Sequence, residues 1–455
     1  MSAATLVIVL GVLTPAFGFF VTATVLPSVI ADVGGLAFYA WASTAYSVAS
    51  ILGSATSAVI VRKTATRTAL LVASAIFVAG TIACALAPSM LVLVAGRALQ
   101  GFGGGMMIAA VHGVVRDVFP EALWPRMLAM ISVAWGVAAM SGPAIGGTFA
   151  SLGVWRGAFW IIVPLTVVAA ALTWRIVPHA PAHAKGSASR VPLGRLALLC
   201  VGVLCVASVA NVASTIVRVA LVLAALGAIA LVLRLDARAR ERLFPADMLS
   251  LSRPMGKAFG MIFFLAMCTT PGSVYIPLLL QILQGFAPAT AGYFYAAQSL
   301  AWTFAALVVT RLAGHQLRVA LVAGPLMIAI GFAGLLATIS TGPAIAIAVA
   351  IVVVGAGVGT CWAPVGTIVL GAARHGEGPA AASMIPTTQT FAVALGAALC
   401  GIVGNAAGLS SAASRPVAAL AGGWLFTIFL MAPLGALAMA SGLRAPGRDD
   451  RPAAA

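Results

Sequence analysis

Apolar residues run along this chain in long blocks separated by short polar breaks. Fourteen blocks can be counted, and most have the roughly 20 residues that an α-helix needs to cross the hydrocarbon layer of a bilayer. Six blocks come first, at 6–30, 40–61, 69–87, 90–115, 127–152 and 158–177; two shorter blocks follow, at 196–213 and 216–233; six more lie at 258–283, 289–309, 319–339, 344–373, 380–407 and 417–440. The pattern predicts an all-α polytopic membrane protein with fourteen spans in a six–two–six plan.

Two longer polar breaks divide the chain into parts. The stretch 178–195 is rich in Pro, Ala and Ser, which is typical of a flexible linker, and the stretch 234–257 is basic. Between the two shorter blocks, only residues 211–215 offer a turn. We therefore expect a six-helix bundle at 1–177, linkers and two extra central transmembrane helices at 178–257, a second six-helix bundle at 258–443, and a short basic tail at 444–455.

Composition and charge agree with a surface that faces lipid. Of the 455 residues, 62% are hydrophobic and 7% are charged, whereas soluble domains carry about 25% charged residues. With the N-terminus in the cytoplasm, 21 of the 25 Lys and Arg residues fall on the inner side, which is the bias of membrane proteins. We therefore expect a multi-pass protein of the cell (plasma or inner) membrane with both termini in the cytoplasm.

Charge also argues against a nucleic-acid-binding protein and against a cleaved signal peptide. A net charge of +16 would fit a nucleic-acid partner, but no basic soluble face with interleaved aromatic residues is present. The first block has no basic segment before it and is too long for the apolar part of a signal peptide, so it is interpreted as a retained span. We expect no nucleic acid among the partners.

The sequence offers little reactive chemistry. All six cysteines lie in apolar blocks without a CxxC pair or a Cys/His cluster, which predicts packing roles and neither disulfides nor a metal site: Cys84, Cys200, Cys205, Cys268, Cys361 and Cys400. The glycines between 101 and 105 are not followed by the GK[ST] of a phosphate-binding loop. No cluster of nucleophiles, paired acids or metal ligands is present, so we expect neither an enzyme nor a cofactor.

Two motifs are specific enough to indicate a family. The two six-span blocks carry similar basic loops after their second spans, and repeated halves are typical of secondary carriers. In the fourth block, Gly-Arg-Ala-Leu-Gln-Gly-Phe-Gly-Gly-Gly at 96–105 resembles the RxxQGxGxA signature of the major facilitator superfamily. In the fifth, a run of small residues is similar to the antiporter motif of that family's drug/proton exchangers: Gly136, Gly142, Pro143, Gly146 and Gly147. With its extra pair of spans, the chain most resembles the fourteen-span drug/proton antiporter branch, the multidrug efflux type.

The resemblance implies export of small apolar or amphipathic compounds by alternating access, coupled to protons, by a monomer. Arg97 is a strong base deep in a span; it either couples protonation to substrate binding, or it snorkels outward or bonds carbonyls. Asp32, at the outer end of the first span, either meets Arg97 or is a solvated loop acid or a helix cap. His112 either carries protons or is a hydrogen-bonded histidine with a packing role. The first span lacks the acid that relatives keep upstream of the Leu-Pro pair, so proton coupling rests on the resemblance.

The resemblance also implies a cytoplasmic gating loop after the second span. Its basic residues are present as Arg62, Lys63 and Arg67, but Val61 stands where the family pattern has its Asp and Thr64 where it has its Gly. Because these two positions differ from the family pattern, we expect a gate that is looser or that is rebuilt by Asp117 and Glu121. Positive-inside topology alone also explains the three cations.

Candidates for the lining of the substrate cavity are aromatic, Met and Gln residues on the spans that line it in the resembled fold: Phe20, Tyr46, Gln100, Met107, Trp135, Tyr275, Gln281, Gln298, Trp302, Trp362 and Gln389. Each of them can instead face lipid or another helix. A cavity without acids predicts neutral, anionic or amphipathic substrates. The alternatives are a metabolite carrier or uniporter of the same fold and, from a different class, a non-transporting membrane sensor.

Overall fold

A computed structural model describes most of the chain. It covers residues 3–63, 65–120, 123–178, 193–209, 211–212, 214–239, 245, 247–309, 311–312, 315–372, 374, 378–410, 414–441 and 443. Within these ranges, the side chains of residues 3, 58–59, 61–63, 116–117, 124–126, 128–129, 132, 193, 370, 378–380, 382–383 and 386 are not described. The predicted linker at 178–195 and the predicted tail at 444–455 lie almost wholly outside the described residues.

The described part is helical, with no strand in it. The first half contains α1 (Ala3–Val33), the short 3-10 helix η1 (Leu36–Phe38), α2 (Trp41–Lys63), α3 (Thr66–Ala85), α4 (Met90–Val118), α5 (Trp124–Ser151), α6 (Arg156–Trp160) and α7 (Ile162–Ile176). A pair follows, α8 (Leu193–Val209) and α9 (Thr215–Ala237). The second half contains α10 (Pro254–Cys268), α11 (Thr270–Val274), α12 (Ile276–Gln284), α13 (Pro288–Val309), α14 (His315–Thr338), α15 (Ala344–Gly371), α16 (Gly378–Ala406), α17 (Arg415–Phe429) and α18 (Met431–Ala440).

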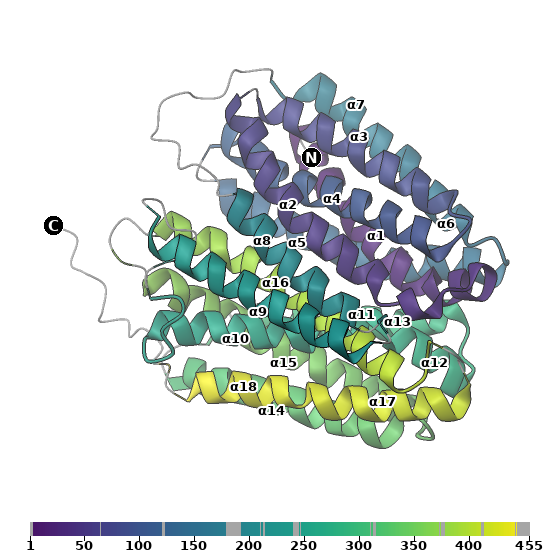
Figure 1. Ribbon diagram of the computed structural model, residues 1–455. Coiled ribbons are helices and arrows are strands. Elements are labelled where there is room, and N and C mark those ends of the chain that lie inside the picture. Colours follow the sequence, from purple (N-terminus) through teal and green to yellow (C-terminus); the bar gives the residue numbers. More distant parts are fainter. Residues whose placement is uncertain are drawn as a thin grey trace.

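The long helices lie side by side, with the first half in purple and blue above the second half in green and yellow (Figure 1). Eleven helices or consecutive helices are long and apolar enough to cross a membrane. The remaining three of the fourteen predicted blocks correspond to α2, α5 and the 17-residue α8, whose described residues do not meet that measure. The prediction of an all-α architecture is confirmed for the described residues, whereas the count of fourteen spans stays a prediction.

Three of the predicted continuous spans are broken, and a proline follows the helix end by three or four residues at each break. A proline cannot donate a backbone hydrogen bond, and its ring collides with the carbonyl four residues earlier. Pro164 and Pro433 follow the ends of α6 and α17 by four residues, and Pro271 and Pro277 follow the ends of α10 and α11 by three. The predicted span at 258–283 is therefore three helices, and those at 158–177 and 417–440 are two each.

Both halves contain one helix pair held at backbone contact by two glycines four residues apart. On α4, a methyl group on Gly101 would lie 2.2 Å from the carbonyl oxygen of Tyr46, and Gly105 faces α2 in the same way one turn further on. On α15, Gly355 faces the carbonyl oxygen of Gln298 at 2.0 Å, and Gly359 faces α13. Small residues let helices in membranes approach closely, so α2–α4 and α13–α15 repeat one packing arrangement.

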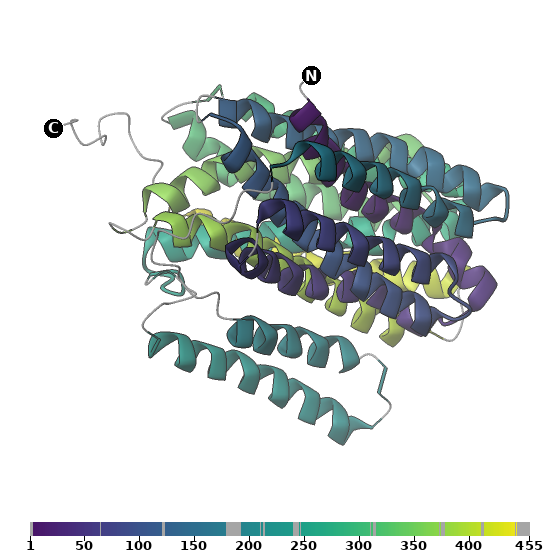
Figure 2. The ribbon, with the colours of Figure 1, turned by 90° about the horizontal axis from the view of Figure 1, so that it is seen from above.

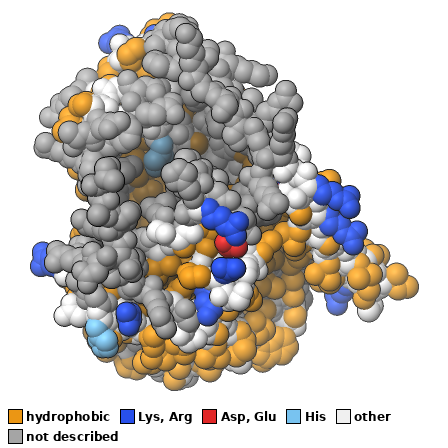
Figure 3. Space-filling view, turned by 90° about the vertical axis from the view of Figure 1, so that its left-hand side faces the viewer, with side chains coloured by type: hydrophobic (Ala, Val, Ile, Leu, Met, Phe, Trp, Pro, Cys, Tyr) orange, Lys and Arg blue, Asp and Glu red, His pale blue; other side chains and the backbone are white. Residues whose placement is uncertain are grey.

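The helix ends define two ends of the molecule. At the Asp32 end, α1 ends and α2 begins; at the opposite, Arg-rich end, α7 ends and α8 begins. Figure 3 shows the Arg-rich end, where blue Lys and Arg side chains spread over the described surface with little red among them. Arg374 makes an ion pair of 2.9 Å with Asp247, and a second ion pair, Arg195–Asp236, joins α8 to α9.

The α8–α9 pair is a hairpin on one side of the molecule, with α8 nearer to the two halves (Figure 2). α8 packs on both α2 and α16. The two halves also meet directly, since α5 packs on α13, α2 on α16, and α1 on α12 and α13. The hairpin therefore covers a seam between the first and second halves.

Candidate functional site

Arg97 is held inside the first half of the molecule. Its side chain on α4 is 1% exposed, its Nε donates to the carbonyl of Ala42 at 3.3 Å, and its Nη1 donates to Oε1 of Gln100. Gln100 in turn donates to the hydroxyl of Thr81 at 2.9 Å. The guanidinium also lies 4.1 Å from the ring centre of Tyr46, a cation–π contact. Arg97 therefore bonds neutral groups inside the bundle and does not snorkel to an end.

An aromatic cluster lies next to this cation and contains residues of both halves: Phe19, Phe20, Tyr46, Trp135 and Tyr295. The rings of Phe20 and Tyr295 lie 5.4 Å apart, and Phe19 contacts Tyr46 at 6.2 Å and Trp135 at 6.5 Å between centroids. Trp135 is 37% exposed, whereas Phe20, Tyr46 and Tyr295 are buried. Four helices supply these rings, α1, α2, α5 and α13, so the cluster spans the junction of the halves.

Asp32 does not contact Arg97. It forms an ion pair of 2.7 Å with Arg156 and accepts a hydrogen bond of 3.1 Å from Nε1 of Trp155. Arg156 also donates to the carbonyl of Ala87 at 3.1 Å. These contacts join the ends of α1, α3 and α6, so Asp32 connects helix ends of the first half.

The other described acids are also paired with arginines. Asp236 pairs with Arg195, and Asp247 accepts three hydrogen bonds from Arg374. Both pairs lie toward the Arg-rich end. Among the acid side chains that the structure describes, none lies at mid-depth beside Arg97. Asp117 and Glu121, considered above for a rebuilt gate, have side chains outside the described set.

His112 lies on α4 at a distance from Arg97. Fifteen residues separate them, which is about 22 Å along a helix. Its side chain is exposed, and its Nδ1 lies 2.8 Å from the carbonyl of Ile108. Because residues seven apart share a helix face, His112 continues the face on which Gly105 meets α2. The three coupling candidates thus occupy three separate places.

The antiporter-like motif lies where α5 meets α1 and α13. A methyl group on Gly142 would lie 2.5 Å from Cβ of Phe20, and one on Gly147 would lie 2.3 Å from Cα of Ala289. Gly146 faces the carbonyl of Val21 at 3.3 Å. Pro143 lies against Gly292 of α13 at the same junction, whereas Gly136 has no atom within 4 Å of its added methyl position. Four of the five motif residues therefore act in close packing at the junction.

The other lining candidates are divided among several places. Trp302 and Trp362 form an edge-to-face pair at 5.1 Å in the second half. Tyr275 stacks on Tyr39 at 5.2 Å near the Asp32 end. Met107 and Gln298 are buried at 0% and 4% exposure, and the half-buried glutamines are Gln281 and Gln389.

The predicted gating loop is described only in part. Arg67 lies 4.1 Å from the ring centre of Trp174, which joins α3 to α7. The side chains of Arg62 and Lys63 lie outside the description. A cation–π contact within the first half is therefore the one role that can be assigned to this group.

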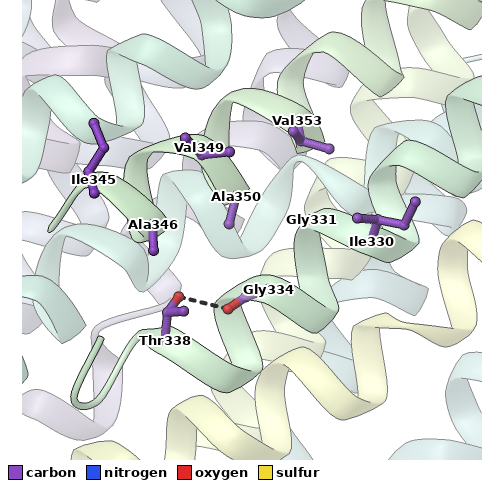
Figure 4. A pocket seen from close by; sticks show the side chains of 9 residues that line it. All are labelled: Ile330, Gly331, Gly334, Thr338, Ile345, Ala346, Val349, Ala350 and Val353. Atoms are coloured by element: carbon purple, nitrogen blue, oxygen red, sulfur yellow. Dashed lines mark hydrogen bonds between the residues drawn. The ribbon is translucent and has the colours of Figure 1, made fainter. Parts of the chain in front are cut away.

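A groove between α14 and α15 is not a candidate for the site. It has a volume of about 340 Å³ and is lined mainly by apolar side chains, including Ile330, Ile345 and Val349. In Figure 4, the hydroxyl of Thr338 points to the carbonyl of Gly334, with which it makes a 2.7 Å hydrogen bond. The groove presents no free polar group for a substrate.

Sequence reasoning missed three aromatic residues of these clusters. Phe19 directly precedes Phe20, and a search for adjacent rings would have found it. Tyr295 and Tyr39 join their clusters through contacts between segments far apart in the chain, which no spacing pattern indicates. No group of metal-ligating residues occurs in the described ranges.

Comparison with known proteins gives the family. The model of the Major Facilitator Superfamily matches residues 8–397. The chain belongs to this superfamily. It is 33% identical over 408 residues, 85% of this chain and 84% of the relative, to a Mycobacterium tuberculosis protein named "Probable multidrug-efflux transporter". It is also 34% identical to an efflux pump of Dothistroma septosporum over 31% of this chain and 24% of that protein.

Solved structures agree on the facilitator fold. A POT family transporter in complex with 5-aminolevulinic acid gives a TM-score of 0.70 at 14% identity, covering 95% of this chain and 94% of that one. A nucleoside transporter gives a TM-score of 0.67 at 10% identity, covering 96% and 100%. With eleven helices able to cross a membrane, this facilitator is a multi-pass membrane protein. The resemblance to the superfamily is confirmed, and the fourteen-span drug/proton antiporter branch stays a prediction.

Proposed function

We propose that this facilitator is a secondary active transporter that exports small apolar or amphipathic compounds, drugs and antibiotics among them, by alternating access. Its similarity to a named multidrug-efflux protein extends over 85% of the chain, which supports the same class of cargo. The proposal needs no cofactor.

The aromatic cluster carries this proposal. Its five rings come from both halves, so a compound bound there touches the two parts that move relative to each other in alternating access. Aromatic surfaces bind varied apolar compounds, and Trp135 is the most accessible ring, at 37% exposure. Arg97, behind Tyr46, adds a positive charge to the first-half side of this site.

The charges near the site favour neutral or anionic compounds over cations. Arg97 is a buried cation, and each of the acids Asp32, Asp236 and Asp247 is paired with an arginine elsewhere. A cationic compound at the cluster would meet like charge without a described carboxylate to compensate it. We therefore expect carboxylate-bearing or uncharged amphipathic substrates.

The proposed arrangement in the membrane follows the charge distribution. We propose fourteen spans, with a bundle at 1–177, the linkers and the extra pair at 178–257, a second bundle at 258–443 and a tail at 444–455. The Arg-rich end would face the cytoplasm, in keeping with the positive-inside bias, and both termini with it. The protein would act as a monomer in the cell membrane.

Proton coupling is part of the proposal and has two candidate groups. Arg97 keeps its charge and would act by changing partners between Gln100, Tyr46 and the substrate. His112 is exposed, and an imidazole can accept and release a proton, so it would carry the proton at the Arg-rich end of α4. Asp32, paired with Arg156, would instead hold helix ends together.

Reconstitution into liposomes tests the proposal. Purified protein is reconstituted into liposomes that enclose a pH-sensitive dye, and a pH gradient is imposed. We then add a panel of matched amphipathic compounds with anionic, neutral and cationic head groups. We expect gradient-driven movement of neutral and anionic members, with a matching change of internal pH.

The same assay separates the alternatives. Substrate movement that leaves the internal pH unchanged would favour a uniporter or metabolite carrier of this fold. Transport restricted to the cationic members would overturn the proposed charge preference. No movement of any panel member would favour a non-transporting role.

A further inference from the structure

The connection between α1 and α2 is held from two sides at a single carbonyl. The carbonyl oxygen of Ala37 accepts a hydrogen bond of 3.1 Å from Nδ2 of Asn211 and one of 3.0 Å from Nδ2 of Asn405. Asn211 lies at the turn of the α8–α9 hairpin, and Asn405 lies near the end of α16 in the second half. A backbone carbonyl has two lone pairs, and these two amides use both.

The orientation of the Asn211 amide follows from its partners. Its Oδ1 accepts a hydrogen bond of 3.0 Å from Nε1 of Trp41, and its Nδ2 donates to Ala37. An indole N–H only donates and a carbonyl only accepts, so the amide fits in one orientation. Asn211 thereby fixes the position of the α1–α2 connection relative to the start of α2.

Two further contacts join this connection to the second half. The ring of Tyr39 stacks on that of Tyr275 with a centroid distance of 5.2 Å and an interplanar angle of 20°, and both side chains are buried. A methyl group on Gly401 of α16 would lie 2.9 Å from Cβ of Ala40. The connection is thus one part of the first half that closes onto the second half at the Asp32 end.

The hairpin is itself seated on the seam between the halves. Sγ of Cys200 on α8 lies 3.7 Å from the carbonyl of Val48 on α2. Leu196 and Val203 of α8 pack in one cluster with Val48 and with Ala394 of α16. Because α8 is anchored along its length, the Asn211 turn is held in a defined place beside Ala37.

We propose that Asn211 is a positioning residue for closure of the Asp32 end, and that the α8–α9 hairpin acts as a latch on the α1–α2 connection. By holding the Ala37 carbonyl, Asn211 keeps this connection where Asn405 and Tyr275 can dock. The latch assists alternating access and so rests on the proposed transport function. Its test measures accessibility without any substrate, so it can fail independently of that function.

Isosteric variants and a native thiol provide the test. Asn211→Asp keeps an acceptor for Trp41 but cannot, as a carboxylate, donate to Ala37; Asn405→Asp removes the second donor. Cys400 is buried on α16, one turn before Gly404, where an added methyl group would lie 2.3 Å from the hydroxyl oxygen of Tyr275. It serves as the reporter when the other five cysteines are replaced by alanine. A membrane-impermeant maleimide is added separately to each side of sealed proteoliposomes, and the rate of labelling is measured.

We expect either variant to speed labelling of Cys400 from the Asp32 side by roughly threefold to tenfold, the effect of losing one intramolecular hydrogen bond on an equilibrium. Ser208→Ala, near the same turn, removes a hydroxyl that donates to the carbonyl of Leu204 in its own helix and is expected to leave the rate unchanged. An unchanged rate in Asn211→Asp would overturn the proposal.

A second reporter separates opening from unfolding. Cys84 is buried in the first half, where its thiol contacts the carbonyl of Leu93 at 3.7 Å. In a background that retains only Cys84, the maleimide should label Cys84 of the Asn211→Asp variant at the same rate as Cys84 of the parent. A rise at Cys84 equal to that at Cys400 would mean general loosening and would also overturn the proposal.

Discussion

At the scale of single residues, the site combines a buried cation with rings and amides in place of acids. Arg97 has a carbonyl, an amide oxygen and a tyrosine ring as partners. Burying a charge is costly unless hydrogen bonds compensate it, so these neutral partners have to be correctly placed. The sequence identified Arg97 and Gln100 from their motif and named Tyr46 as a cavity candidate, but the contact of that ring with Arg97 had to come from the fold.

Replacement of Arg97 tests its role. We expect Arg97→Ala to reduce gradient-driven transport to the level of protein-free liposomes, because the positive charge beside the aromatic cluster is lost. Two opposing effects on stability should nearly cancel: the acceptors on Ala42 and Gln100 lose their donor, at about 1–3 kcal/mol each, while the cost of burying a charge disappears. Initial transport rates and thermal unfolding temperatures are the measurements.

Two further variants calibrate that result. Arg97→Lys keeps the charge but not the planar fork that reaches two acceptors, so we expect about a tenfold slower rate. Arg175→Ala, an exposed position at the end of α7, should transport like the parent. Normal transport by Arg97→Ala would refute a role for this residue in coupling.

At the scale of helices, apolar blocks predicted where helices lie better than whether they are continuous. Each of the fourteen blocks corresponds to one helix or to consecutive helices, because burial in lipid requires backbone groups to bond within the segment. Proline positions alone do not locate the breaks, since Pro15 and Pro27 lie inside the continuous α1 and Pro143 lies inside the continuous α5. The contacts of Asp32 with Arg156 and Trp155 were not readable, since they depend on how helix ends meet.

Glycines of the antiporter-like motif offer a matched pair of variants on α5. A methyl group on Gly147 would lie 2.3 Å from Cα of Ala289, whereas one on Gly136 meets nothing within 4 Å. We expect Gly147→Ala to separate α5 from α13 at a cost of about 1–3 kcal/mol. Gly136→Ala should be neutral or stabilising by up to about 1 kcal/mol, because alanine favours helix.

Thermal unfolding in detergent and transport in liposomes measure both variants. Gly147→Ala should lower the unfolding temperature and slow transport. Gly136→Ala should reduce neither the unfolding temperature nor the transport rate. If the two alanines behaved alike, the contact between α5 and α13 would not be the reason for glycine at position 147.

At the scale of the whole molecule, several contacts between the halves lie at the Asp32 end. Gly147 meets Ala289, Asn405 bonds Ala37, and Tyr39 stacks on Tyr275. The sequence predicted two similar halves from their loops and motifs. It could not predict which end they close, because that depends on pairs of residues up to 368 positions apart.

A reversible cross-link tests whether the Asp32 end has to open. A methyl group on Gly401 would lie 2.9 Å from Cβ of Ala40, and disulfides join Cβ atoms about 3.5–4.5 Å apart, so a small shift allows the bond. In a background without the six native cysteines, Ala40→Cys with Gly401→Cys should lose transport on oxidation and regain it on reduction. Each single variant should be insensitive to the oxidant. Full transport by the oxidised, cross-linked protein would mean that the halves need not separate at this end, and alternating access through the Asp32 end would be excluded.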